Sequence, residues 1–98
     1  MNRTRRKALF HFGQVVATPG ALRELQAEAV DVLDLLVRHV TGDWGEVDAH
    51  DRQANDDGVK HGGRIVSVYP VPGIPDGRVW VITEADRSAT TVLLPSEY

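Results

Sequence analysis

The sequence predicts a small α+β domain, with a mainly antiparallel sheet of about four strands and two or three helices on one side. Two apolar runs, Val79–Ile82 and Thr91–Leu94, flank the polar segment Glu84–Ser88. This is the pattern of a β-hairpin with a loop of about four or five residues. Residues 19–41 carry apolar side chains at helical spacing, and strand-like runs precede and follow them. The predicted order is one strand, two or three helices, then three strands.

The length and the charge distribution predict one folded domain, residues 8–98, preceded by a disordered basic arm, residues 1–7. The arm holds four of the eleven cationic residues, which leaves residues 8–98 with seven cations, fourteen anions and a net charge of −7. An acidic body argues against a broad nucleic-acid-binding face. It leaves a weak nucleic-acid contact through the arm, whose cations are Arg3, Arg5, Arg6 and Lys7.

Several classes of protein are excluded by what the sequence lacks. Without cysteine there is no disulfide or thiolate chemistry, and no apolar run is long enough to span a membrane. We expect a cytoplasmic protein that makes no membrane contact. The sequence has no GxGxxG, P-loop, HExxH or GxSxG motif, so we expect no cofactor. The four histidines do not have metal-site spacing, so we expect no metal.

The first elements are indicated by apolar patterning and a helix-start signal. Leu9–Ala17 is rich in aromatic and β-branched residues and predicts a strand, in which Gly13 indicates a bulge or a close backbone approach. Thr18 followed by Pro19 predicts the start of a helix. Its apolar face would be Leu22, Leu25 and Ala29.

The strongest helical pattern follows Asp31. It predicts a helix that buries one stripe and ends at Gly42, the stripe being Leu33, Leu36, Val37 and Val40. No glycine or proline separates this segment from the preceding one, so residues 19–41 could form one helix or two.

The second half predicts a surface helix and the remaining strands. Asp48 could cap a polar helix that extends to about Lys60. Arg64–Tyr69 reads as a strand. Residues 70–77 contain three prolines and two glycines, which favours a flexible or polyproline-like connection.

The hairpin tip is the first candidate site. Glu84, Asp86 and Arg87 could supply a carboxylate base and an anion-binding guanidinium. The same composition is typical of a solvated turn in which Asp86 and Ser88 bond local backbone and Arg87 pairs with a carboxylate, and we favour that interpretation.

The second candidate site is the Asp43–Trp44 turn together with Tyr69. Trp44 could anchor a partner, although we favour a lid over one end of the core. If this turn and the hairpin tip lie at the same end of the sheet, their polar and aromatic groups would share one binding site.

Five segments of the chain resemble a family of small bacterial proteins carried by plasmids and other mobile elements. They are FGQVVATPGAL (12–22), RHVTGDWG (38–45), DRQAND (51–56), RIVSVY (64–69) and WVITEADRSATTVLLPSEY (80–98). The resemblance implies an association with mobile elements but no known activity. Residues 70–77 form a longer turn than that family has, and Ala29-Val30 replaces its usual break between the helices. Some members are labelled type I restriction endonuclease subunit M, but this chain is too short for a methyltransferase domain and lacks its Gly-rich loop.

Our leading hypothesis is therefore a non-catalytic accessory protein of a mobile genetic element. It would act through contacts with a protein, itself or another, at an exposed edge strand or near Trp44. The alternative is a small hydrolase or nuclease-like toxin that combines the hairpin tip with His39 or Asp43. The sequence leaves open whether the protein is an enzyme.

Overall fold

The computed structural model describes residues 7–98; residues 1–6, with most of the predicted basic arm, lie outside the described part. The α+β fold class is confirmed. In chain order, the elements are β1 (Gln14–Ala17), α1 (Pro19–Ala27), α2 (Val32–Val40), α3 (Ala49–His61), β2 (Ile65–Pro70), β3 (Arg78–Thr83), β4 (Ala89–Leu93) and a final 3₁₀ turn, η1 (Pro95–Glu97).

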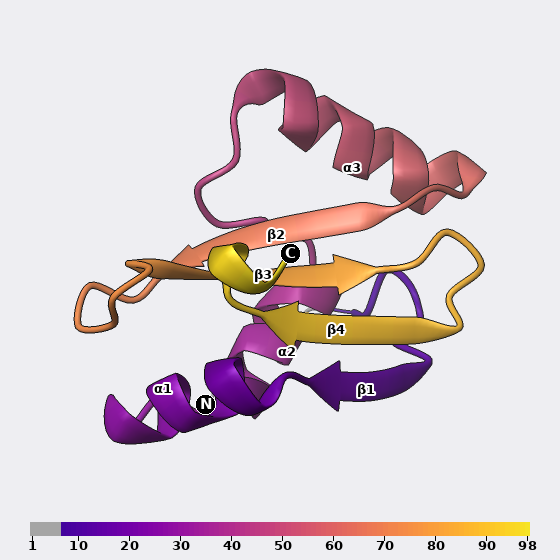
Figure 1. Cartoon of the computed structure of the whole chain (residues 1–98). Coiled ribbons are helices and arrows are strands. Elements are labelled where there is room, and N and C mark those ends of the chain that lie inside the picture. The colour runs from indigo at the N-terminus through magenta and orange to yellow at the C-terminus, as the bar shows by residue number, and fades with distance from the viewer. Residues whose placement is uncertain (1–6) are drawn as a thin grey trace, which may run out of the picture.

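The four strands form one mixed sheet in the order β1-β4-β3-β2 (Figure 1). β2, β3 and β4 form an antiparallel meander, which includes the predicted hairpin with its loop at Glu84–Ser88. β1 lies parallel to β4, with Gln14 opposite Ala89 and Ala17 opposite Val92. The first and last strands of the chain are therefore neighbours, and β1 and β2 are the two edges of the sheet.

The hydrophobic core lies between one face of the sheet and the helices α1 and α2. It is built from alternate residues of the strands and from two apolar positions on each helix: Ala21, Leu25, Leu35, Leu36, Tyr69, Val79, Val81 and Val92. α3 lies along the outer side of β2 (Figure 1). The chain returns over the other face of the sheet in η1, where the ring of Tyr98 lies 5.2 Å from that of Trp80.

Residues 19–41 form two helices. Thr18 caps α1 by accepting a hydrogen bond from the Ala21 N–H, as its sequence predicts. Ala29 then adopts a left-handed conformation, with φ 55°, which breaks the helix without a glycine. Asp31 caps α2 through the N–H of Leu33.

The predicted apolar stripe of α2 is only half right. Leu36 and Val40 are buried, but 60% of Leu33 and 51% of Val37 are exposed. The helix instead turns His39 into the core, where the sheet supplies its hydrogen-bond partners. A satisfied buried histidine thus shifts the buried face away from the side that the hydrophobic pattern favours.

Two other segments differ from their predictions. β1 is shorter than Leu9–Ala17, because the N–H of Leu9 bonds the Val40 carbonyl of α2 instead of a strand. Residues 70–77 are a compact double turn rather than a flexible connection. The N–H of Val71 donates to the Gly77 carbonyl, and the N–H of Ile74 donates to the Val71 carbonyl. The side chains of Val71 and Ile74 are both buried.

No helix within residues 7–98 is both long enough and apolar enough to cross a membrane.

Candidate functional site

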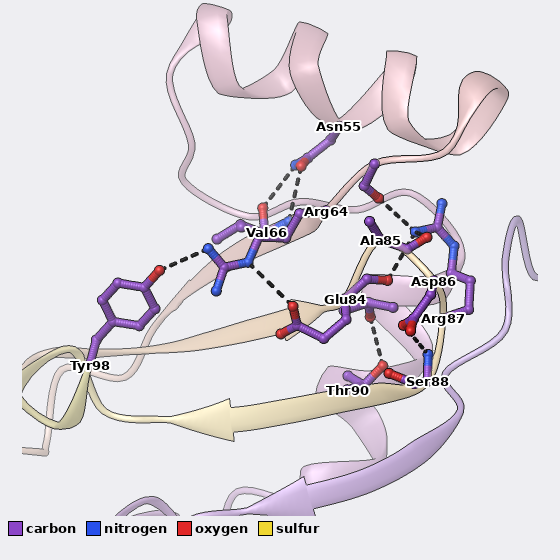
Figure 2. Close-up of polar contacts among 12 residues, drawn as sticks. Asn55, Arg64, Val66, Glu84, Ala85, Asp86, Arg87, Ser88, Thr90 and Tyr98 are labelled. Atoms are coloured by element: carbon purple, nitrogen blue, oxygen red, sulfur yellow. Dashed lines mark hydrogen bonds and ion pairs between the residues drawn. The ribbon is translucent and has the colours of Figure 1, made fainter.

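Arg87 at the hairpin tip binds four backbone carbonyls. Its Nη1 donates to Gly63 at 2.6 Å and to the carbonyls of Glu84 and Ala85 at 3.2 Å, while Nη2 donates to Gly58 at 2.8 Å. Gly58 lies in the last turn of α3, where a positive charge is favourable. Figure 2 shows the guanidinium between the hairpin loop and the end of that helix. The side chain that we considered as an anion ligand ties the hairpin to α3.

The two carboxylates of the tip are also engaged, in different ways. Asp86 accepts the Ser88 N–H at 2.9 Å, and hydrogen bonding to Ser88 holds the pKa of its carboxyl below the usual value. Glu84 lies on the other side of the loop, 4.0 Å from Arg64 Nε, and Arg64 also donates to the Tyr98 hydroxyl (Figure 2). Asp86 thus bonds local backbone, as the solvated-turn interpretation predicts, whereas Arg87 binds backbone carbonyls and not a carboxylate.

Asp43, Trp44 and Tyr69 come together at the other predicted site. The Tyr69 hydroxyl donates to the Asp43 carbonyl at 2.6 Å, and burial raises the pKa of this phenol to about 12. The indole of Trp44 is 4% exposed and its N–H donates to Asp56 of α3 at 3.1 Å. Trp44 is thus the core lid that we favoured, and Arg38 covers the Tyr69 ring at 4.4 Å.

The two predicted sites are joined through the ring of Phe10. It stacks on Trp44 at 6.3 Å between centroids, and the Arg87 guanidinium lies 5.4 Å from its centre. Side chains fill the space between the two predicted sites, and no pocket is found among residues 7–98.

A series of hydrogen-bonded, buried polar side chains lies beneath these sites. It was not predicted from the sequence. His39, Ser67, Thr83 and Thr90 all have 0% exposure. The Thr90 hydroxyl donates to the Phe12 carbonyl at 2.7 Å, so it accepts from Thr83 at 2.6 Å. Thr83 in turn accepts from His39 Nε2 at 2.9 Å, which leaves Nδ1 to accept the Ser67 hydroxyl at 2.6 Å.

The surroundings of His39 keep its imidazole neutral. Burial first, and then the positive charge of Arg87, lower the pKa of His39 to about 4. A serine hydroxyl that donates to a histidine is the arrangement of an activated nucleophile. Here both side chains are fully enclosed, so the arrangement is a structural network. Its only sequence signal is the position of Ser67 between Ile65 and Tyr69 on the buried face of β2.

One group of possible metal ligands occurs in residues 7–98, formed by Asp48, His50 and Asp51. All three side chains are exposed, and Asp48 already caps α3 through the N–H of Asp51.

The outer edge of β2 is closed by the rest of the chain. The Asn55 amide donates to the Val66 carbonyl at 2.8 Å and accepts the Val66 N–H at 3.0 Å (Figure 2). The N–H of Val68 donates to Trp44 and its carbonyl accepts from Glu46. Pro70 has no N–H, so no partner can add a strand here.

The outer edge of β1 is open. The N–H groups of Gln14 and Thr18 bond Ser88 and Val92 on the β4 side, so the N–H and C=O groups of Val15 and Ala17 point outward. Neither residue has a hydrogen bond on that side within the described chain. The side chains of Val15 and Val16 are 43% and 42% exposed.

The helix α2 also exposes apolar side chains. Arg38, on one flank of α2, lies over Tyr69 of β2. Leu33 and Val37 lie on the opposite flank of that helix and are exposed.

No known family model, curated protein or solved structure matches the chain, so its resemblance to plasmid-borne proteins stays a prediction.

Proposed function

We propose that this protein is a non-catalytic accessory protein that acts through protein contacts, and that a partner's extended strand docks on β1. The observation that carries the proposal is the difference between the two edges. β2 has its outward backbone groups occupied by Asn55 and by residues 44–46, whereas β1 offers free groups beside exposed valines. Strand addition at a free edge is a common way to bind a protein segment.

The toxin alternative has less support from the same geometry. The guanidinium of Arg87 is used by carbonyls, and His39 is fully enclosed. A nuclease also needs a basic surface to bind phosphates, whereas residues 8–98 carry a net charge of −7. A role on a mobile genetic element and a cytoplasmic location belong to the proposal through the resemblance and the composition alone.

Site-specific photocross-linking tests the proposal even when the partner is unidentified. A photoreactive amino acid replaces Val16 at the β1 edge, and in a matched variant replaces His50, whose side chain is 91% exposed on α3. We expect one discrete cross-linked protein from position 16 and none from position 50. Equal labelling from both positions, or none from position 16, would contradict the proposal.

A further inference from the structure

We propose that the partner is a second copy of this chain, whose β1 pairs antiparallel with β1 across a two-fold axis. The four-stranded sheet of each copy would then be half of one continuous sheet. This inference rests on the proposed function and names its partner.

The backbone directions fix the register of this pairing. Only Val15 and Ala17 have outward N–H and C=O groups within β1, and Gly13, with φ 66°, is out of the strand conformation. Pairing Val15 with Ala17 of the other copy uses all of these groups in four hydrogen bonds. Pairing Val15 with itself makes only two. The favoured register places the axis at Val16, whose Cα would lie about 4.5 Å from its symmetry mate.

The absence of charged residues around β1 favours pairing of β1 with a second copy. A two-fold axis brings identical residues together, so a charged residue near it would repel its own copy. Residues 8–17 contain no aspartate, glutamate, lysine or arginine, although charged residues make up 26% of the chain. Natural edge strands often carry such a charge to prevent pairing. β1 lacks it.

The closed β2 edge limits the assembly to two copies. After β1 has paired with β1, both outer edges of the joined sheet are β2, and each is covered by Asn55 and by residues 44–46. The interaction is therefore closed, as expected of a two-fold dimer, and does not extend into a fibre.

Two variants remove the pairing by different means. Val15→Pro deletes an outward N–H that the monomer does not use, which an edge strand tolerates. Val16→Lys places two positive charges at the axis and leaves the backbone unchanged. Leu33→Lys is the matched control: it puts the same charge on an exposed position of α2, outside β1.

The experiment combines sedimentation equilibrium with amide hydrogen exchange on the full chain over a range of concentrations. We expect the wild type to form a dimer, with exchange at Val15 and Ala17 slowing as the concentration rises. Both β1 variants should raise the dimer dissociation constant at least about tenfold, the equivalent of roughly one hydrogen bond. Leu33→Lys should leave it within about twofold. The melting temperature of each variant shows that it is folded.

Three results would overturn self-pairing. They are a wild type that stays monomeric at every concentration, a dimer in which Val15 and Ala17 exchange freely, and a dimer that Leu33→Lys dissociates but the β1 variants do not. Cross-linking from position 16 to a different protein would also overturn it while leaving the proposed function intact. The absence of any cross-link from that position would count against both.

Discussion

His39 is a titratable side chain that the fold holds neutral. Its burial explains why α2 buries a different face from the one that the apolar pattern predicted. Its two nitrogens bond Ser67 and Thr83, and its ring packs against Phe10 at 5.2 Å. Burying an unpaired polar group costs free energy, so the helix orientation that satisfies this ring is favoured over one that buries Leu33 and Val37.

We predict that stability falls as the pH drops from about 6.5 to about 4. The pKa of His39 is near 6.5 when unfolded and about 4 when folded, so in this range the unfolded chain binds more protons. The loss is expected to reach up to about 3 kcal/mol. Urea unfolding at several pH values measures it.

The variant His39→Gln tests the assignment of this pH dependence. This variant should be less stable than wild type at pH 7. Its free energy of unfolding should depend less on pH above about pH 4.5, where the carboxyls with lowered pKa values stay ionised. The exposed His50→Gln is the control and should follow the wild type. Parallel profiles for wild type and His39→Gln would contradict the prediction. Asp86 and Glu97, whose pKa values are lowered by hydrogen bonds, act only at lower pH.

At the scale of elements, α3 is held by polar contacts more than by apolar ones. Its buried residues are Asn55 and Gly58, and Gly58 leaves room for the Ile65 side chain of β2. Asn55 closes the sheet edge while Arg87 binds the end of the helix. A helix that is polar nearly all round can thus pack firmly without an apolar stripe.

We predict that Arg87→Ala lowers the free energy of unfolding by about 1–3 kcal/mol, because it leaves four carbonyls without their charged donor. For a domain of this size each kcal/mol lowers the melting temperature by about 4–8 °C. Arg52→Ala, on the exposed side of α3, is the control and should change stability by less than about 0.5 kcal/mol. Thermal unfolding by circular dichroism measures both. An Arg87→Ala protein that melts like wild type would show that these bonds contribute little.

At the scale of the whole molecule, the C-terminal segment contacts both the start of α1 and strand β3. Glu97 accepts the Thr18 hydroxyl and the Leu94 N–H, and so links η1 to the start of α1. Tyr98 covers Trp80 on the face of the sheet opposite the helices.

Removal of residues 95–98 is predicted to destabilise the domain and to expose Trp80. The emission of Trp80 should shift to longer wavelength, whereas Trp44, 4% exposed in the core, should be unaffected. Fluorescence of the truncated protein in a Trp44→Phe background isolates the signal. If the emission of Trp80 is unchanged, Tyr98 does not shield it in solution.

The features that sequence predicted are those set by neighbouring residues. Thr18 and Asp48 cap their helices, and Glu84–Ser88 forms the hairpin loop, because each signal is local. The α+β class followed from the same signals. The parallel pairing of β1 with β4 joins residues 75 positions apart, from Gln14 to Ala89, and has no local signal.

The roles of the site residues were harder to predict, because their partners are distant backbone atoms. Arg87 binds Gly58 and Gly63, and Asn55 binds Val66, so the sequence alone indicated only a solvated turn and a polar surface helix. Trp44 was predictable as a lid because its size favours burial whatever its partners.

The parallel pair also has a consequence for how the protein is made. β1 leaves the ribosome before its neighbour β4, so β1 has no β4 to pair with until the residues between them have been made. At about 5–20 residues per second, the wait for the intervening residues lasts roughly 4–15 s. During that time both sides of an uncharged apolar strand are open to other nascent chains. The chain can complete its sheet only once β4 has followed β1 out of the ribosome.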